Sequence, residues 1–141
     1  MTITIPKNNS PDTIFEELLK NCIKLGEGTS RLVYEIPGHD DKVIKASKLE
    51  ANFSNWSEII AYHYNRDDGK LAEILSWSWS GKYIVMERLT PLKPGEASEY
   101  NFPEYLTDRK PSNLGRDKDG AIKALDYGCL KFPETYKSFF A

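Results

Sequence analysis

The sequence contains few of the residues that mark metal centres or disulfide-bonded folds. Only two cysteines and two histidines occur among its 141 residues. Cys22 and Cys129 lie far apart and fit no metal-ligand spacing, so we expect reduced thiols and a cytoplasmic protein. His39 and His63 belong to no catalytic pattern, and we interpret them as a turn residue and a helix residue.

The sequence also lacks an excess of one charge and a long apolar run. Its 19 basic residues nearly balance its 21 acidic residues, which gives a net charge of -2. This balance gives no reason to expect binding to nucleic acid or to an anionic membrane. No apolar stretch approaches the roughly 20 residues of a membrane span, and residues 1–6 lack the features of a signal peptide. We therefore expect neither a nucleic-acid partner nor a membrane partner.

The most informative feature that is present is a pair of motifs in the last third of the chain. Residues 108–113 read Asp-Arg-Lys-Pro-Ser-Asn, and residues 126–128 read Asp-Tyr-Gly. Between them, Asp119-Gly120 is a dipeptide typical of a hairpin turn. A hairpin at this point would carry Asn113 and Asp126 back towards each other.

Two oxygen-bearing side chains brought together in this way can hold a hard cation. Mg²⁺ takes one or two such protein ligands and completes its shell with water and phosphate oxygens. The carboxylate of Asp108 is then left to orient a hydroxyl group. These are the parts that phosphoryl transfer requires.

With these motifs the chain resembles the protein kinase superfamily. The resemblance implies that Asp108 is the catalytic-loop base and that Lys110 contacts the transferring phosphate. It implies that Asn113 and Asp126 are the metal ligands, with Asp126 in a Tyr variant of the Asp-Phe-Gly motif. The family usually has His-Arg before the catalytic Asp, whereas this chain has Leu106-Thr107.

Motifs earlier in the chain follow the kinase order. Residues 25–34 resemble the glycine-rich phosphate loop, with Arg31 in place of its third glycine, and residues 43–45 resemble the strand with the phosphate-anchoring Lys45. Glu58 is the best candidate for the helix glutamate that pairs with this lysine, so we expect the two within salt-bridge distance. Residues 83–89 resemble the strand and hinge that hold adenine. The ATP contacts implied are Gly26, Gly28, Val33, Lys45, Met86 at the gatekeeper position, Glu87 and Leu89.

The expected fold class is α+β. We expect a helix that begins with Ser10 as N-cap and Pro11 as its first residue, with an apolar stripe of Ile14, Phe15, Leu18, Leu19 and Cys22. A second helix is predicted over residues 51–66. Strands are predicted over residues 23–26, 31–36, 42–47, 71–79 and 82–89, with a turn at residues 37–41. This order is typical of a kinase-like small lobe, a five-stranded antiparallel sheet plus a helix.

The predicted domain organisation is a single minimal kinase-like domain over residues 1–141. Residues 1–89 would form the small lobe with an added N-terminal helix, and residues 90–103 a linker. Residues 104–141 would form a strongly reduced large lobe, limited to the catalytic and metal-binding hairpins. Short kinase-like chains that end soon after Asp-Tyr-Gly also resemble those of bacteriophages, where they act on host proteins in the host cytoplasm.

Each motif alone has a plainer interpretation. The two glycines could form an ordinary turn, Lys45 and Glu58 could be solvated, and residues 108–113 could be a capped turn. Their agreement in kinase order favours the family interpretation.

Three functions stay open. The first is an ATP- and Mg²⁺-dependent phosphotransferase that transfers the γ-phosphate to a protein hydroxyl. The second is a kinase-like module that binds nucleotide or a partner protein without turnover. The third is a small-molecule phosphotransferase resembling the antibiotic kinases, against which Lys110-Pro111 and the Tyr-Gly after Asp126 argue. For the first two we expect a protein target or self-association, through the helix at residues 11–22, the linker, or the aromatic tail with Tyr136, Phe139 and Phe140.

Overall fold

The computed structural model describes residues 4–28, 30–48, 53–104, 106, 109–125 and 127. The predicted base Asp108 and metal ligand Asp126 lie outside the described residues, as does the predicted aromatic tail. The chain divides into two compact units. Unit 1 comprises Met1–Trp56 and Glu73–Arg88, and unit 2 comprises Ser57–Ala72 and Leu89–Ala141.

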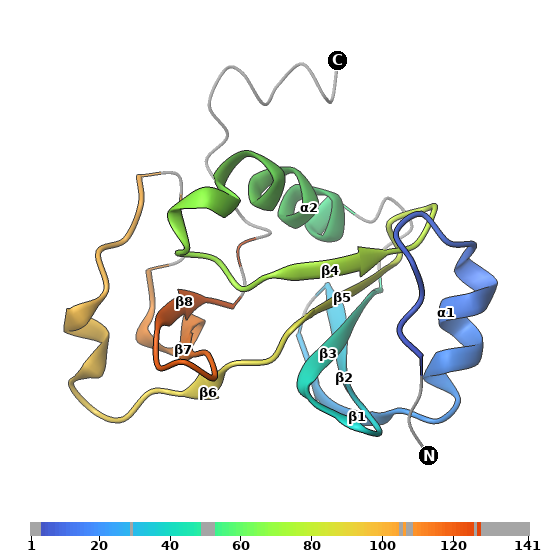
Figure 1. Cartoon of the computed structure of the whole chain (residues 1–141), viewed down its shortest axis with the longest axis horizontal. Helices are drawn as coiled ribbons and strands as arrows, with labels where there is room; N and C mark the ends of the chain where they lie inside the picture. The colour runs from blue at the N-terminus through green and yellow to red at the C-terminus, as the bar shows by residue number, and fades with distance from the viewer. Residues whose placement is uncertain are drawn as a thin grey trace. The chain divides into compact units, whose positions relative to one another are not determined.

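A five-stranded antiparallel sheet forms the centre of unit 1 (Figure 1). Its strands are β1 (Ile23–Glu27), β2 (Arg31–Ile36), β3 (His39–Ser47), β4 (Ile74–Trp77) and β5 (Tyr83–Glu87). Their order across the sheet is β1-β2-β3-β5-β4. The predicted α+β class with a five-stranded antiparallel sheet and a helix is therefore confirmed, and this sheet is consistent with a kinase-like small lobe.

The connection between β2 and β3 is tighter than predicted. Ile36 pairs directly with His39, and the turn between them consists of Pro37 and Gly38, with Gly38 at φ 84°. A glycine in the left-handed region allows this two-residue turn without steric cost. The predicted turn over residues 37–41 is wrong, because the polar residues that suggest a longer loop form the exposed start of β3.

Helix α1 (Asp12–Leu19) covers one face of this sheet. The core beneath it consists of Phe15, Leu18, Ile36, Ile44, Ala46, Tyr83 and Val85. The rings of Phe15 and Tyr83 are nearly parallel, with centroids 6.0 Å apart. The predicted stripe is therefore correct at Phe15 and Leu18, but Ile14 is 47% exposed and lies outside the core.

The start of α1 also differs from the prediction. The Ser10 hydroxyl donates to the carbonyl of Lys7 over 2.7 Å and does not cap the helix. The Asp12 carboxylate instead accepts hydrogen bonds from the N–H and the hydroxyl of Ser80, in the turn between β4 and β5. Trp79 N–H also donates to the Ser10 carbonyl over 3.0 Å, so Ser10 pairs with the residues that directly follow β4.

The helix α2 is described over Phe53–Asn65, and it ends one residue before the end of the predicted range, where the 3₁₀ turn η1 (Arg66–Asp68) follows it. Residues 51 and 52 of the predicted range lie outside the described residues. Gly69 ends this segment at φ 68°, in the left-handed conformation typical of helix C-termini. The first residues of α2 up to Trp56 belong to unit 1, and the residues from Ser57 onwards belong to unit 2.

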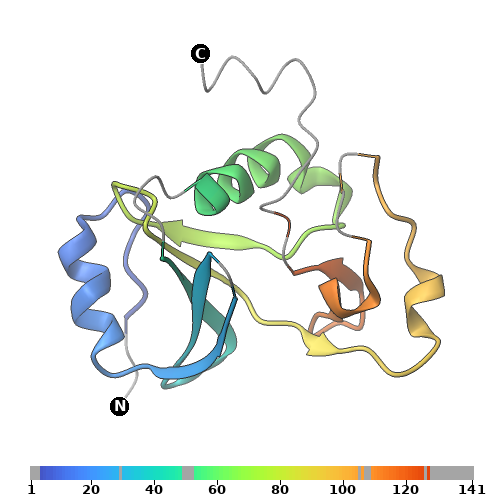
Figure 2. The ribbon, with the colours of Figure 1, turned by 180° about the vertical axis from the view of Figure 1, so that it is seen from behind.

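Unit 2 contains a three-stranded antiparallel sheet of β6 (Thr90–Pro91), β7 (Leu114–Arg116) and β8 (Ile122–Ala124), which Figure 2 shows from behind. Two 3₁₀ turns, η2 (Glu96–Glu99) and η3 (Pro111–Asn113), precede β7. The hairpin predicted at Asp119-Gly120 is confirmed, because β7 and β8 pair from Leu114↔Ala124 to Arg116↔Ile122. Gly120 stands in its turn at φ 88°.

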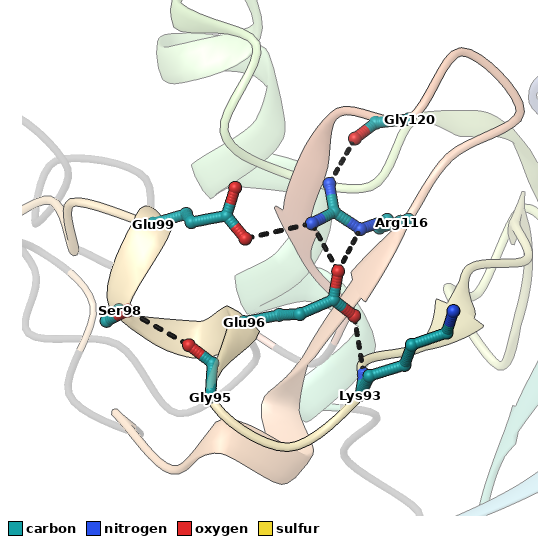
Figure 3. A network of polar contacts seen from close by, with 7 residues as sticks. All are labelled: Lys93, Gly95, Glu96, Ser98, Glu99, Arg116 and Gly120. Atoms are coloured by element: carbon teal, nitrogen blue, oxygen red, sulfur yellow. Dashed lines mark hydrogen bonds and ion pairs between the residues drawn. The ribbon is translucent and has the colours of Figure 1, made fainter.

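A polar network holds η2 to this hairpin (Figure 3). The Arg116 guanidinium donates twice to Glu96, over 3.0 and 2.6 Å, and once to Glu99 over 3.0 Å. It also donates to the Gly120 carbonyl over 2.6 Å. The other oxygen of the Glu96 carboxylate accepts from the Lys93 N–H, so one arginine joins the segment after β6 to the turn between β7 and β8.

Among the described residues, the helices are too short and too polar to cross a lipid bilayer.

Candidate functional site

The predicted phosphate loop is the connection between β1 and β2. Gly28 N–H donates to the Arg31 carbonyl over 2.8 Å, which closes the turn. Lys48, the residue after β3, contacts the loop: its N–H donates to the Ser30 carbonyl over 2.8 Å. Its ammonium group donates to the Gly28 carbonyl over 3.0 Å and to the Glu27 carboxylate over 2.6 Å. The loop is thus held by main-chain and side-chain contacts on both of its arms.

Packing does not explain the two glycines of this loop. Neither Gly26 nor Gly28 has a positive φ. A Cβ on Gly26 would meet no described atom within 4 Å, and a Cβ on Gly28 would meet only the Arg31 carbonyl oxygen at 3.9 Å. Glycine also allows a ligand to approach the main chain closely, and this explanation fits the phosphate group that the sequence predicts here.

The salt bridges beside the loop keep Glu27 ionised. Its carboxylate lies 2.7 Å from the Lys24 ammonium and 2.6 Å from that of Lys48. The hydrogen bond from Lys24, followed by that from Lys48, lowers the pKa of Glu27 to about 2. The edge of the loop therefore carries one carboxylate and two ammonium groups at neutral pH, with a net charge of +1.

Three of the predicted ATP contacts form one row across the sheet. Gly26 of β1 pairs with Val33 of β2, which pairs with Lys45 of β3. Directly paired residues of antiparallel strands project to the same face of a sheet. Lys45 also pairs with Ile84 of β5, and Met86, two residues further along β5, projects to the same face. Val33, Lys45 and Met86 therefore share the face opposite to the one that α1 covers.

Lys45 is buried, with only 5% of its surface exposed. An ionised amine taken out of water has to be compensated by a counter-charge or hydrogen bonds. The predicted partner Glu58 is completely buried, in the part of α2 that belongs to unit 2. Its carboxylate accepts a hydrogen bond from the Tyr127 N–H over 3.2 Å. The ion pair between Lys45 and Glu58 stays a prediction.

The residues predicted to form the hinge lie at the end of β5 and just after it. Glu87 N–H donates to the Glu73 carbonyl over 2.8 Å, and the Glu87 carboxylate accepts from the Glu73 N–H over 3.1 Å. Leu89 begins the second segment of unit 2, where its Cβ lies close to Gly115. The contacts of Met86, Glu87 and Leu89 with adenine remain predictions.

The predicted metal ligand Asn113 lies beside Leu125, the residue that follows β8. Asn113 is buried at the end of η3, and its carbonyl accepts a hydrogen bond from the Leu125 N–H over 3.0 Å. Asp126 follows Leu125 directly in the sequence. The hairpin therefore brings the main chain of Asn113 next to Leu125, and the approach of Asn113 and Asp126 stays a prediction.

The residue after Asp126 is also held in unit 2. The Tyr127 hydroxyl donates to the Ala72 carbonyl over 2.7 Å, and the side chain is buried. Its N–H donates to Glu58. Lys110 is exposed at the start of η3, where its carbonyl accepts from the Asn113 N–H over 2.9 Å. Leu106, which replaces the histidine of the family motif, is buried.

The donor set predicted for the metal fits Mg²⁺. An amide oxygen and a carboxylate oxygen are hard ligands, and Mg²⁺ typically takes few of them beside water and phosphate. Across the described ranges, no three or more His, Cys, Asp or Glu residues gather as a cage for a metal ion. A site that relies on nucleotide phosphates for the remaining ligands does not need such a cage.

Sequence reasoning missed one buried residue near the loop. Asn55, in the first turn of α2, is fully buried and contacts both Arg31 and the main chain of Lys45. A polar residue at the start of a predicted helix usually faces solvent, so the sequence carried no signal for this contact.

Neither a protein-family model nor a curated protein matches the chain. Among solved structures, the chain is similar to the ternary complex of APH(2")-IIa with streptomycin and ATP, at 14% sequence identity and a TM-score of 0.45. The match covers 66% of this chain and 34% of that one, so this chain spans about a third of that protein's length. Similarity at this level carries no argument about function, which has to come from the residues themselves.

Proposed function

We propose that the chain is a minimal ATP- and Mg²⁺-dependent phosphotransferase of protein-kinase type, which transfers the γ-phosphate to a protein hydroxyl. The observation that carries the proposal is the row Gly26↔Val33↔Lys45 across β1, β2 and β3. The row places a buried lysine on the same face as Val33, beside a loop whose glycines have no packing role. This arrangement supports a site for the phosphates of a nucleotide.

The hairpin of unit 2 supports the catalytic half of the proposal. Asn113 and Asp126 would hold a magnesium ion, which when bound supplies charge neutralisation for the phosphate oxygens. Asp108 would orient the acceptor hydroxyl and take its proton, and Lys110 would contact the transferring phosphate. The hydrogen bond between Leu125 and Asn113 favours this arrangement, because it joins the two segments that carry the ligands.

The alternative is a kinase-like module that binds nucleotide or a partner protein and regulates that partner without turnover. Both versions include a protein target or self-association. In the described residues, the candidate surfaces are α1 and the segment of residues 90–103. The two versions differ only in whether Asp108 meets an acceptor hydroxyl, so a turnover assay separates them.

The proposal is tested by nucleotide binding and phosphoryl transfer together. ATP with Mg²⁺ should raise the melting temperature by mass action, equivalent to about 2.7 kcal/mol at a concentration 100 times the Kd. Lys45→Met should remove most of this shift. Lys42→Met is the matched control, because Lys42 lies on the same strand but projects to the opposite face, where it pairs with Asp41.

Two further variants separate the metal from the base. Asp126→Ala should abolish the Mg²⁺-dependent part of the shift, and Asp108→Asn should reduce turnover by orders of magnitude with little change in ATP affinity. If millimolar ATP with Mg²⁺ produces no thermal shift, the proposal is overturned. A shift without phosphoryl transfer to any protein would establish the binding module instead.

A further inference from the structure

Asn55 forms an unusual junction inside unit 1. Its side-chain amide nitrogen donates to the carbonyls of Gly81 and Lys82, both over 2.8 Å, and to the Lys45 carbonyl over 3.4 Å. Its amide oxygen accepts from the Arg31 guanidinium over 3.4 Å. Because carbonyls only accept and a guanidinium only donates, these partners fix the orientation of the amide. One buried side chain thus joins α2 to β2, to β3 and to the turn between β4 and β5.

The partners of Asn55 include both predicted phosphate-binding elements. Arg31 is the first residue of β2, within the predicted glycine-rich segment, and Lys45 carries the amine that should anchor the phosphates. A second contact also joins the loop to α2: the hydroxyls of Ser30 and Ser54 lie 3.2 Å apart. The first turn of α2 therefore contacts the end of the loop and the main chain of the lysine strand at once.

Arg31 stands where the resemblance expects a third glycine. Its side chain is buried, with 6% of its surface exposed, and it therefore does not extend into solvent over the loop. A buried guanidinium is retained only where its donors find acceptors. Where a glycine would have no side chain, Arg31 therefore connects the loop to α2.

We propose that Arg31 and Asn55 are positioning residues for phosphate binding, which hold the glycine loop in register with Lys45. The inference rests on the proposed ATP binding. Phosphate recognition requires the loop N–H groups and the lysine amine each to be placed to within about an ångström of the position that contacts the phosphate. A loop already held in the bound geometry costs less ordering on binding, and the affinity rises accordingly.

The alternative explanation is that Asn55 only stabilises the fold. Its two sets of hydrogen bonds allow this structural role to be distinguished from a role in positioning the loop. Its bonds to Gly81 and Lys82 fasten the turn between β4 and β5, which supports the fold. Its bond to Arg31 reaches the loop. Arg31→Met keeps the apolar stem and removes the donor to Asn55. Asn55→Asp keeps an acceptor for Arg31 but places a carboxylate against two carbonyl oxygens.

The experiment measures, for each variant, unfolding by urea without ligand and the Kd values of MgATP and of adenosine. Arg31→Met should bind MgATP about five- to tenfold more weakly, with adenosine affinity changed by less than about twofold. Asn55→Asp should unfold at lower urea concentration yet keep the wild-type ratio of the two Kd values. Arg66→Met, at an exposed arginine of η1, is the control and should change neither ligand's affinity.

The double variant Arg31→Met with Asn55→Ala tests whether the two side chains act as a pair. If they do, the double variant binds MgATP no more weakly than Asn55→Ala alone, because both changes remove one contact. Should Arg31→Met fail to fold, Arg31→Lys serves instead. Lysine keeps the buried charge but loses the planar fork, so it should show the same selective loss for MgATP.

The outcomes that would overturn the inference are distinct from those that would overturn the proposed function. Wild-type protein that binds no MgATP refutes both. Wild-type binding with an unchanged MgATP affinity in Arg31→Met or Arg31→Lys refutes the inference alone. Equal weakening of MgATP and adenosine, in proportion to lost stability, also refutes it, because this is the signature of a structural role.

Discussion

Replacing Gly26 by alanine separates what the fold needs from what the proposed site needs. The added Cβ would meet no described atom within 4 Å, and the residue has no positive φ. With neither a clash nor backbone strain, the substitution acts through the unfolded chain and should stabilise the protein by about 0.4–1 kcal/mol. The same methyl group would lie where the main chain should approach a phosphate, so MgATP affinity should fall by about tenfold, or about 1.4 kcal/mol.

Gly115→Ala is the matched comparison for packing. A Cβ on Gly115 would lie 2.5 Å from the Leu89 Cβ and 2.9 Å from the Thr90 carbonyl oxygen. Both are close to or part of the main chain, so β6 has to move, at a cost of about 1–3 kcal/mol.

Urea denaturation without ligand measures the stability of both glycine variants, and titration with MgATP measures the affinity. The reasoning is refuted if Gly26→Ala loses as much stability as Gly115→Ala. It is equally refuted if Gly26→Ala binds MgATP as tightly as the wild type does.

Three further substitutions test contacts within one unit each. Burial raises the pKa of Asp12, but the hydrogen bonds from Ser80 and Ser78 and the charge of Lys82 together lower it below its ordinary 3.8; Asp12→Asn should therefore cost about 1 kcal/mol at pH 7, measured by thermal melts. Because the folded-state pKa is the lower one, this stabilisation is present above pH 3.8 and is lost as the pH falls through the folded value, and a pH-independent loss would contradict the assignment. Tyr127→Phe leaves the buried Ala72 carbonyl without this donor and should cost about 1–3 kcal/mol in urea denaturation; an unchanged midpoint would show that the bond contributes nothing. Arg116→Lys cannot reproduce a guanidinium that contacts two glutamates and a carbonyl (Figure 3), so it should lower the melting temperature more at low salt than at high salt; equal losses would exclude an electrostatic role.

The strands were predictable because their signals are local. Residues 31–36 are rich in β-branched and aromatic residues, with Val33, Tyr34 and Ile36, and β2 has the predicted bounds. The hairpin of β7 and β8 followed from Asp119-Gly120 alone, since this dipeptide suits the positive φ that such turns require. Its consequence, the main-chain bond between Asn113 and Leu125, needed only the strand register.

The missed features depend on contacts distant in sequence. Serine is a preferred N-cap residue, but the main chain of Ser10 pairs with Ser78, just after β4, and Ser10 lies outside the helix. Asn55 gains its burial from the turn between β4 and β5, which meets it more than 20 residues later in the chain. No local pattern around Asn55 encodes this approach.

In β3, some side chains are explained by the core and one is explained by the proposed function. Val43, Ile44, Lys45, Ala46 and Ser47 are all buried, and a strand buried on both faces normally reads as a continuous apolar run. Ile44 and Ala46 point into the core beneath α1, which explains their identity completely. The core cannot explain Lys45, because a long apolar side chain would fill the same space without burying a charge. Burying the charge of Lys45 costs folding free energy, and the fold does not require the glycine at Gly26. Two such residues in one row are expected where a binding site, and not the core, determines the side chains.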